Sequence, residues 1–472
     1  MNDYAPTTAF TAETAVASVD ASSTSLLTDM YELTMLQGAL ASGTATRRSV
    51  FELFGRRLPA SRRFGVVAGT GRLLDAIEAF TFTPSQIDFL HRTGVVNDET
   101  LDFLRDYRFT GTVRGYAEGE CYFAGSPLLT VEGTFAEACI LETLALSIYN
   151  YDCAVASAAS RMTIAAHGRP CVDFGARRAH EQAAVAAARA SVVGGFVGTS
   201  NLEAGLLYGI PTVGTSAHSF TLLHDSEEDA FAAQVASLGP STTILVDTYD
   251  IATGVERAVK AARAAGGELG AVRLDSGDLV AEAFKVRAQL DALGATSTKI
   301  TVTNDLDEHA IAALGAAPVD SYGVGTKLVT GSGRPTAALV YKLVEREGAD
   351  GTMEEVAKFS SGGKSTVGGR KWAGRTLTSE GTAAEELVVS SSSQEQGLAA
   401  LSEAGARPLQ VLLVDEGRII EEHRGKGALS AAAERHRAAR AELPYDAWRL
   451  SDGESALPTR HVDLDGRSAT RR

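Results

Sequence analysis

Apolar and polar positions follow one repeating layout over the middle of the chain, from about Cys171 to about Leu343. A short apolar run is followed by a few polar or glycine residues and then by an alanine-rich stretch with helical spacing, in a cycle of ~20 to 35 residues. The alanine-rich stretches predict helices, for instance at Ile251–Ala265, Leu279–Leu293 and Leu306–Leu314. The apolar runs predict strands at Cys171–Phe174, Gly195–Val197, Thr212–Val213, Thr243–Val246, Gly270–Leu274, Lys299–Val302 and Asp320–Val324.

Strands that alternate with helices predict a parallel sheet, and this number of units suggests closure into an irregular α/β barrel. An open doubly wound sheet is the alternative. In a barrel, the polar residues that follow each strand gather at the C-terminal face, where barrel enzymes place their chemistry. These polar segments are Gly175–Arg178, Gly198–Asn201, Gly214–Ser219, Asp247–Asp250, Asp275–Asp278, Asn304–Asp307 and Gly325–Lys327.

The flanks of this middle region have a different pattern. The N-terminal flank predicts a helix around Leu26–Leu40, a strand near Val50–Phe54, and antiparallel strands with glycine and proline breaks over Val113–Glu132. The C-terminal flank alternates short strands with glycine-rich turns and ends in a helix around Ala428–Leu443. We therefore expect a disordered tail at 1–24, a barrel catalytic domain at 151–344, and a discontinuous α+β domain built from 25–150 and 345–472.

Composition places the chain among ordinary globular proteins, since 44% of its 472 residues are apolar and 22% are charged. Its net charge of −15 argues against nucleic acid or an anionic membrane as a partner. Small anions remain suitable ligands because they need only a local pocket. The 4 cysteines are too widely spaced for a C-x-x-C motif and too few for a disulfide framework, which fits a reducing compartment.

The sequence shows neither a secretory signal nor a membrane span. The first residues lack a basic start followed by an apolar run, so no secretory signal is expected. The most apolar stretch, Phe135–Ile164, is interrupted by charged residues such as Glu142 and Arg161, which argues for buried helices rather than a membrane span. A cytoplasmic protein is expected.

One histidine, His218, lies at a strand end within the small and hydroxylated residues Gly214–Ser219. Small residues let a ligand approach the backbone, and a neutral imidazole can accept a phosphoryl group from ATP or exchange protons near neutral pH. The alternative is a capping or buried structural histidine.

The segment Arg273–Asp278 ends another strand with a cation, two carboxylates and a turn glycine. The planar guanidinium of Arg273 suits a substrate carboxylate. Asp275 and Asp278 suit ribose hydroxyls or a hydrated Mg²⁺. The alternative for the carboxylates is helix capping, which explains one of them but leaves the arginine unexplained.

Three further segments suit phosphate groups. Gly323, Gly325 and Thr326 come late in the βα rhythm, where barrels bind phosphate through backbone amides, although a bare G-x-G is also an ordinary turn. Arg177 and Arg178 form a pair at a strand end that suits pyrophosphate, unless one is merely solvated. The basic stretch Lys358–Arg375 is either a phosphate-facing loop or a solvated hairpin.

In this order, these segments resemble nicotinate phosphoribosyltransferase, of the type II phosphoribosyltransferase group that also holds the nicotinamide and quinolinate enzymes. The resemblance spans about Leu26 to Leu457, with Ser216 in place of a usual Met and Gly368 in place of a Pro. It rests on Leu27–Met35, Phe174–Ala179, Gly214–Ser219, Val246–Tyr249, Arg273–Leu279, Gly323–Thr326 and Val340–Leu343.

The resemblance implies a homodimer with active sites shared between subunits. It implies that Tyr31 of a neighbouring chain stacks on the pyridine ring, that Thr215 and Arg273 hold nicotinate, and that ATP transiently phosphorylates His218. The implied contacts to phosphoribosyl pyrophosphate are Arg177, Arg178, Ser276, Gly277, Gly323, Gly325 and Thr326.

The implied activity is an ATP-coupled ligase reaction that forms nicotinate mononucleotide and pyrophosphate, the first step of NAD salvage from nicotinate. Mg²⁺ is the expected cofactor, through Asp275 or Asp278 and the substrate phosphates, and ATP the co-substrate. The rivals are a nicotinamide enzyme, a quinolinate enzyme, which would be shorter and without ATP, and a catalytically silent barrel that senses phosphorylated metabolites or scaffolds a partner.

Overall fold

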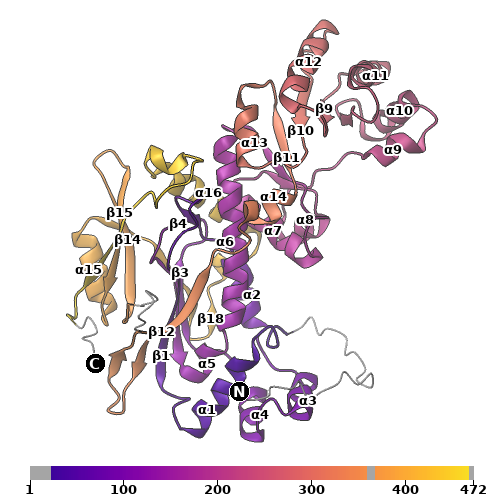
Figure 1. The fold of residues 1–472 in the computed structure, drawn as a ribbon. Helices are drawn as coiled ribbons and strands as arrows, with labels where there is room; N and C mark the ends of the chain where they lie inside the picture. Colours follow the sequence, from indigo (N-terminus) through magenta and orange to yellow (C-terminus); the bar gives the residue numbers. More distant parts are fainter. Residues whose placement is uncertain (1–22, 359–366, 467–472) are drawn as a thin grey trace, which may run out of the picture.

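A computed structural model describes residues 23–358 and 367–466 of the chain (Figure 1). Most of the tail expected at 1–24 lies outside the described residues, as does the middle of the basic stretch Lys358–Arg375. Within the described residues, no helix is long and apolar enough to cross a membrane. All four cysteines are free thiols in buried positions, in agreement with the expected absence of a disulfide framework.

Both flanks contribute to one antiparallel sheet of seven strands. Its order is β13-β12-β1-β5-β3-β17-β18. Strand β12, which contains the boundary expected between residues 344 and 345, pairs with β1 of the N-terminal flank. The bounds are β1 Arg48–Gly55, β3 Thr112–Tyr116, β5 Pro127–Thr134, β12 Leu339–Glu347, β13 Met353–Glu355, β17 Gln410–Asp415 and β18 Arg418–Ile419. This pairing joins segments that are about three hundred residues apart along the chain.

The middle region forms a parallel sheet of six strands in the order β7-β6-β11-β10-β9-β8, which confirms the predicted class of an irregular α/β barrel. The curled sheet is not closed by a ladder between β7 and β8; a single bridge from Thr199 to Thr212 extends its β7 edge. The bounds are β6 Cys171–Asp173, β7 Gly198–Thr199, β8 Thr243–Leu245, β9 Ala271–Leu274, β10 Lys299–Val302 and β11 Ser321–Val324.

Two predicted strands differ from the structure: Thr212–Val213 is reduced to a single bridge at Thr212, and Gly195–Val197 is wrong. Helix α7 ends at Val193, and Gly195 has a φ of 101°, so the chain is still turning where a strand was expected. A positive φ is compatible with glycine but not with extended backbone. The strand therefore begins only at Gly198.

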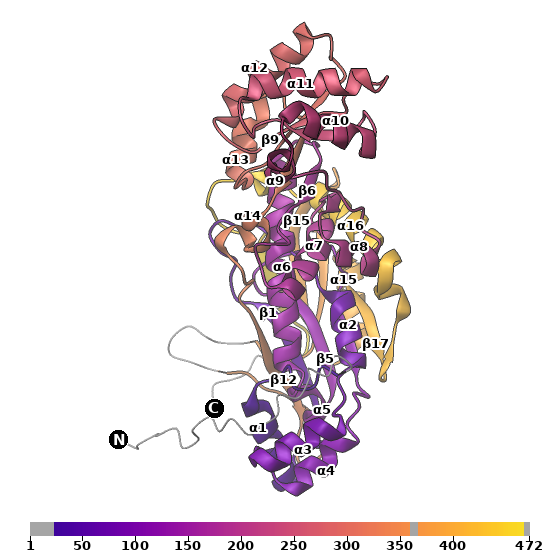
Figure 2. The same cartoon turned by 90° about the vertical axis from the view of Figure 1, so that its right-hand side faces the viewer.

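Apart from the central helix α6 (Glu142–Ala165), the helices fall into three groups along the chain. N-terminal helices are α1 Met30–Ala41, α2 Thr70–Glu78, α3 Pro84–Thr93, α4 Asp98–Arg105 and α5 Phe135–Cys139. Helices of the middle region are α7 Glu181–Val193, α8 Leu202–Tyr208, α9 His218–Leu223, α10 Glu227–Leu238, α11 Ile251–Ala264, α12 Leu279–Ala292, α13 Glu308–Ala313 and α14 Thr326–Val329. Near the C-terminus follow α15 Gln394–Glu403 and α16 Gly425–Ala441. Figure 2 shows α10, α11 and α12 at the end of the molecule opposite α3 and α4.

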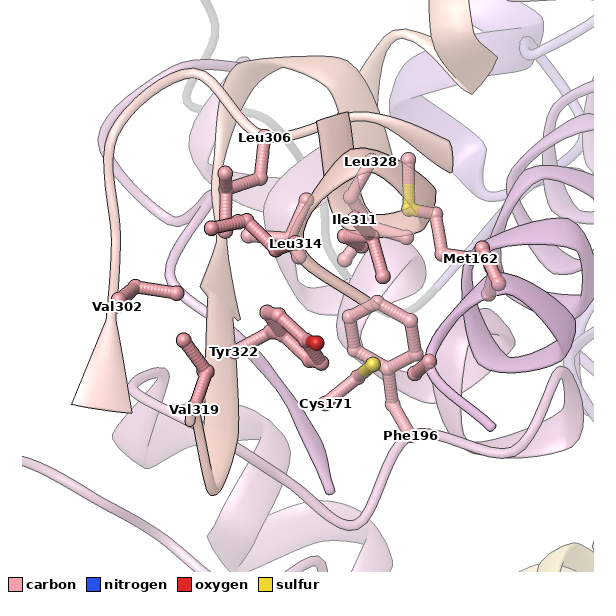
Figure 3. Close-up of a cluster of buried hydrophobic side chains, with 14 of the residues drawn as sticks. Met162, Cys171, Phe196, Val302, Leu306, Ile311, Leu314, Val319, Tyr322 and Leu328 are labelled. Carbon is pink, nitrogen blue, oxygen red and sulfur yellow. The ribbon is translucent and has the colours of Figure 1, made fainter. Parts of the chain in front are cut away.

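A single 24-residue helix, α6 (Glu142–Ala165), runs through the centre of the molecule (Figure 1). Its first half, including Ile148 and Tyr149, packs in the core beneath the antiparallel sheet. Its second half, including Met162, packs in the core of the middle region, part of which Figure 3 shows. The boundary expected between residues 150 and 151 falls inside this helix. The two cores therefore meet along one continuous element.

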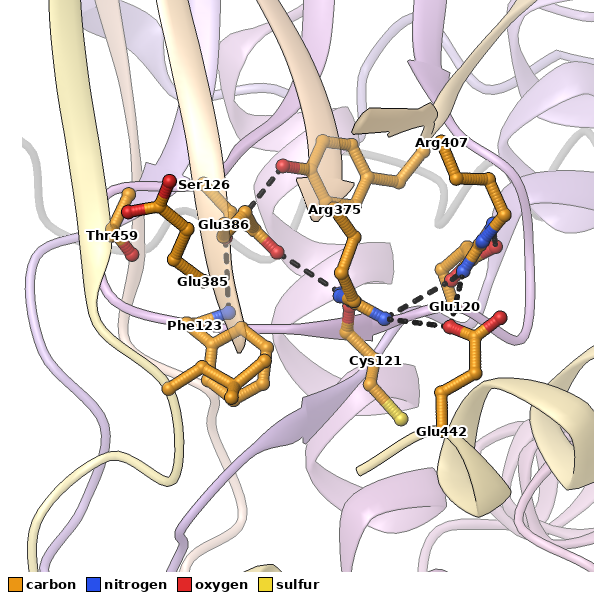
Figure 4. Close-up of polar contacts among 12 residues, drawn as sticks. Glu120, Cys121, Phe123, Ser126, Arg375, Glu385, Glu386, Arg407, Glu442 and Thr459 are labelled. Atoms are coloured by element: carbon orange, nitrogen blue, oxygen red, sulfur yellow. Dashed lines mark hydrogen bonds and ion pairs between the residues drawn. The ribbon is translucent and has the colours of Figure 1, made fainter. Parts of the chain in front are cut away.

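A four-stranded sheet with order β16-β14-β15-β19 completes the fold. A buried cluster of ion pairs, which we call the Arg375 cluster, joins it to the rest of the protein (Figure 4). In this cluster, Arg375 lies 3.0 Å from Glu386, and Arg407 lies 2.7 Å from Glu120 and 2.8 Å from Glu442. Strand bounds are β14 Lys371–Leu377, β15 Ala383–Ser390, β16 Ala406–Pro408 and β19 Thr459–Asp463, and β2 Gly65–Val66 pairs separately with β4 Cys121–Tyr122.

Candidate active site

The main candidate site is a cavity of about 690 Å³ at the carboxyl ends of the parallel strands. It collects residues from six of the seven polar segments that the sequence pattern places after strands; the exception is Asp247–Asp250. Its lining residues are Phe174, Ala176, Arg177, Arg178, Ser200, Val213, Gly214, Thr215, Ser216, Ala217, His218, Ser219, Arg273, Asp275, Thr303, Asn304, Asp305, Gly323, Gly325 and Thr326. Its volume suits a small organic ligand.

His218 is the first residue of α9 and lines this cavity. Its Nδ1 lies 3.0 Å from the Thr248 hydroxyl, and its Nε2 lies 3.9 Å from Oδ1 of Asp247. That Oδ1 is buried and makes no hydrogen bond among the described residues. The other oxygen, Oδ2, accepts from the Asp275 backbone N–H at 2.8 Å and from the Ser276 hydroxyl at 2.7 Å. Asp247 is thus fixed by one oxygen and leaves the other to the imidazole.

Arg273 extends from β9 into the cavity without an internal carboxylate partner. Its Nη2 donates to the carbonyl of Ser216 at 3.1 Å, whereas its buried Nε has no hydrogen-bond partner in the described part of the chain. Burial lowers the pKa of this guanidinium from its ordinary value, against the smaller opposing effects of Asp275 and Asp247. A half-buried guanidinium that has a free donor and no carboxylate partner is suited to bind an anionic ligand.

The two predicted carboxylates of this segment lie in different environments. Asp275 lines the cavity, and its Oδ1 accepts from the Thr303 hydroxyl at 2.6 Å. Asp278 instead caps α12 by accepting from the backbone N–H groups of Val280 and Ala281. It is absent from the cavity lining among the described residues, as are Ser276 and Gly277.

Five of the seven residues expected to bind the phosphoribosyl donor follow or belong to β6 and β11 and line one wall of the cavity; the exceptions are Ser276 and Gly277. Arg177 and Arg178 line the cavity and are exposed. Gly323 must lack a side chain, because a Cβ there would lie 2.5 Å from both the Phe174 ring and the Thr303 methyl group. Gly325 precedes α14, which begins at Thr326. This wall therefore combines exposed guanidinium groups with glycines that let a ligand come close to the backbone.

Tyr31 is not part of this cavity. It lies on α1, at the opposite end of the molecule from β9 and β10 (Figure 1), with 47% of its surface exposed. Burial of its hydroxyl end and the nearby Glu142 raise the pKa of Tyr31. Within one chain, the tyrosine and the cavity are separate.

The basic stretch Lys358–Arg375 is described only in part. Arg370 pairs with Glu132, and the buried Lys371 and Arg375 pair with Glu52 and Glu386. Arg370 and Lys371 are therefore engaged with carboxylates of the seven-stranded sheet, and Arg375 with a carboxylate of its own sheet.

Sequence reasoning did not single out Asp247, Thr248 and Thr303 as site residues. Asp247 and Thr248 belong to the polar segment after β8, so their position was a usable signal. Thr303 follows β10 directly, but nothing in its sequence context marks it as the partner of Asp275.

The fold and the cavity together define a class: an α/β protein with an incompletely closed parallel barrel and a cation-lined cavity at the carboxyl ends of its strands. Two family models match the chain, the nicotinate phosphoribosyltransferase N-terminal domain over residues 26–150 and the nicotinate phosphoribosyltransferase family over residues 170–361. The chain belongs to the nicotinate phosphoribosyltransferase family.

Individual relatives agree with this assignment. The chain is 51% identical to nicotinate phosphoribosyltransferase pncB1 of Mycobacterium tuberculosis over 445 residues, covering 93% of this chain and 95% of that protein. It is 38% identical to nicotinate phosphoribosyltransferase of Bacillus subtilis over 356 residues, covering 74% and 72%. The crystal structure of human nicotinic acid phosphoribosyltransferase aligns with a TM-score of 0.78 at 25% identity, covering 92% of this chain and 97% of that one. The predicted family resemblance is confirmed.

Proposed function

We propose that this protein transfers the phosphoribosyl group of 5-phosphoribosyl 1-pyrophosphate to the ring nitrogen of nicotinate, with ATP acting through His218. The observation that carries the proposal is that one cavity holds an unpaired guanidinium, a phosphate-suited wall and a histidine next to a buried carboxylate. The family membership and the names of the relatives support the same reaction.

Nicotinate would bind through its carboxylate. Arg273 has free donors facing the cavity, and Thr215 lies on the same side in the loop before α9. A guanidinium can donate two parallel hydrogen bonds to a carboxylate but not to a carboxamide. This chemistry favours nicotinate over nicotinamide.

The phosphoribosyl donor would lie along the wall with Arg177, Arg178, Gly323 and Thr326. The bond from the ribose C1 to the pyrophosphate oxygen breaks, pyrophosphate leaves with the electron pair, and the nicotinate nitrogen then bonds to C1. Positive charge develops on the ribose ring in such a transition state, and Asp275, a carboxylate of the cavity lining, would stabilise it. The cationic wall stabilises the leaving group.

Mg²⁺ is part of this proposal, although the described residues include no group of three or more His, Cys, Asp or Glu side chains suited to hold a metal. This fits an ion that is held mainly by substrate phosphates, with one carboxylate from the protein. Asp275 would be that ligand, since Asp278 caps α12. When bound, Mg²⁺ neutralises part of the phosphate charge.

ATP would phosphorylate His218: a ring nitrogen bonds to the γ-phosphorus, ADP leaves, and water later hydrolyses the phosphohistidine. Thr248 and Asp247 orient the ring for this step. Asp247 also accepts from the backbone of Asp275, so the ATP-dependent residue and the transfer site share one anchor. Phosphorylation at His218 would therefore be coupled to the geometry around Asp275.

A homodimer with shared sites is the third part of the proposal. Large apolar side chains are exposed around α1, including Met30 at 61%, and on the helices beside the cavity, including Leu202 at 76% and Leu223 at 77%. Exposed apolar groups of this kind are typical of interaction surfaces. A two-fold pairing that joins the α1 surface of one chain to the α8–α9 surface of another would bring Tyr31 to the partner's cavity.

The test is formation of nicotinate mononucleotide from nicotinate, phosphoribosyl pyrophosphate and Mg²⁺, with and without ATP and with nicotinamide and quinolinate in parallel. We expect product from nicotinate and stimulation by ATP. His218→Ala should abolish the stimulation and leave a slow basal transfer, and an unchanged ATP response in that variant would exclude the phosphohistidine. No product from any of the three substrates would favour the sensor or scaffold alternative.

A further inference from the structure

The loop that carries Thr215 and leads to His218 has few attachments to the rest of the protein. At its start, the N–H of Val213 donates to Thr199, and at its end the carbonyl of Ala217 accepts from Phe220. Between these two points, residues 214–216 form no backbone–backbone hydrogen bond within the described structure. The position of this segment therefore depends on side-chain contacts.

Gln234 of α10 supplies the contact to the middle of the loop. Its side chain is only 4% exposed, and its Nε2 donates to the carbonyl of Thr243 at 2.8 Å. A carbonyl can only accept, so this bond determines the orientation of the amide and directs Oε1 away from β8. Oε1 accepts from the Ser216 hydroxyl at 2.7 Å.

Ser216 in turn holds Arg273. The Ser216 carbonyl accepts from Nη2 of Arg273 at 3.1 Å, which is the only hydrogen bond that the described residues provide to this guanidinium. Arg273 takes part in no ion pair among the described residues, and Asp275 and Asp247 attract it only from a longer distance. A long side chain with a single anchor loses its preferred orientation when the anchor moves.

We infer that Gln234 is a positioning residue for carboxylate recognition: through Ser216 it holds the loop and the Arg273 guanidinium in the orientation that receives nicotinate. This inference rests on the proposed function of the cavity. It concerns the nicotinate side, because Arg177, Arg178 and Thr326 lie on other elements, and the side-chain hydrogen bonds of Gln234 within the described residues go to Ser216, Thr242 and Thr243.

The experiment compares wild type with Ser216→Ala, Gln234→Leu, their double variant and Ser216→Thr, which keeps the hydroxyl. KM for nicotinate and KM for phosphoribosyl pyrophosphate are measured for each. Losing one ordinary hydrogen bond corresponds to about a fivefold effect, so we expect KM for nicotinate to rise about fivefold in either single variant, with KM for the phosphoribosyl donor nearly unchanged. The double variant should be no worse than the worse single variant, and Ser216→Thr should resemble wild type.

A matched control is Gln289→Leu, because Gln289 also donates its side-chain amide to a main-chain carbonyl of a neighbouring element, that of Ala252 in α11, but lies on α12 outside the cavity lining. Equal rises in both KM values, or additive losses in the double variant, would overturn the inference. If Gln234→Leu fails to fold, the comparison of Ser216→Ala with Ser216→Thr decides it. Wild type without activity on nicotinate would overturn the proposed function, whereas active wild type with an unaffected Ser216→Ala would overturn only the positioning role.

Discussion

Arginine has opposite surroundings in the cavity and in the Arg375 cluster. Arg375 has no exposed surface and lies within ion-pair distance of Glu386, Glu120 and Glu442 (Figure 4). Arg273, also largely removed from water, has no carboxylate partner among the described residues and one hydrogen bond to a carbonyl. An internal carboxylate makes the first cation part of the fold, whereas the second is available to a ligand. The presence or absence of an internal carboxylate partner therefore distinguishes structural from functional arginines better than the degree of burial does.

The largest expected effect comes from removing the cation of the Arg375 cluster. Arg375→Met leaves Glu386, which has no exposed surface, without its main cationic partner, and breaking such a pair costs about 3 to 5 kcal/mol of folding free energy. Urea unfolding measures this loss. Arg375→Met combined with Glu386→Gln should recover part of it, because the buried carboxylate is then neutral. A loss below about 1 kcal/mol would remove the basis of the comparison, since only exposed pairs are that weak.

The cavity arginine should show the reverse behaviour. Arg273→Gln removes no internal ion pair, so its unfolding free energy should stay close to that of wild type. Affinity for nicotinate should fall about 100-fold, because a desolvated charge pair with the substrate carboxylate contributes roughly 2 to 5 kcal/mol. Calorimetric or fluorescence titration with nicotinate measures the affinity. The nicotinate affinity of Arg273→Lys should lie between those of wild type and Arg273→Gln. If Arg273→Gln lost as much folding free energy as Arg375→Met, the distinction between the two arginines would be wrong.

A buried carboxylate without a cationic partner among the described residues, Glu32 on α1, extends the comparison from arginines to acidic residues. Glu32 has no exposed surface and accepts from Thr143 and Thr28, but no cation lies within ion-pair distance in the described structure. Burial raises the pKa of Glu32 to about 7. The folded protein therefore binds a proton more tightly than the unfolded chain, and stability should fall as pH rises from about 4.5 to about 7, by at most roughly 3 kcal/mol.

Unfolding curves at several pH values measure that slope, and Glu32→Gln is the control. The amide resembles the protonated acid, so the variant should lose this part of the pH dependence and be at least as stable as wild type at pH 7. If the variant is instead less stable at pH 7 and keeps the slope, Glu32 is ionised in the folded protein and another group titrates.

Much of this molecule could be predicted from local patterns. Helices α11 and α12 begin and end within one residue of the predicted bounds, because Asp250 and Asp278 are strong N-cap residues at the start of amphipathic or alanine-rich stretches. Six of the seven polar segments after strands contribute to the cavity lining, as expected for the carboxyl ends of parallel strands. The irregular short strand near Gly198 was missed because a positive φ at Gly195 is not visible in apolar periodicity.

The order of elements, the face on which the chemistry gathers and the residue types available there all follow from local propensity and strand direction, and so from the sequence. Long-range packing was needed to show that of two nearby carboxylates Asp275 faces the cavity and Asp278 caps a helix. It also decided that Gln234 reaches Ser216 and that Arg375 has carboxylate partners while Arg273 has none. These outcomes depend on contacts between residues far apart in sequence, and a side chain's role depends on the partners that packing brings within about 3 Å.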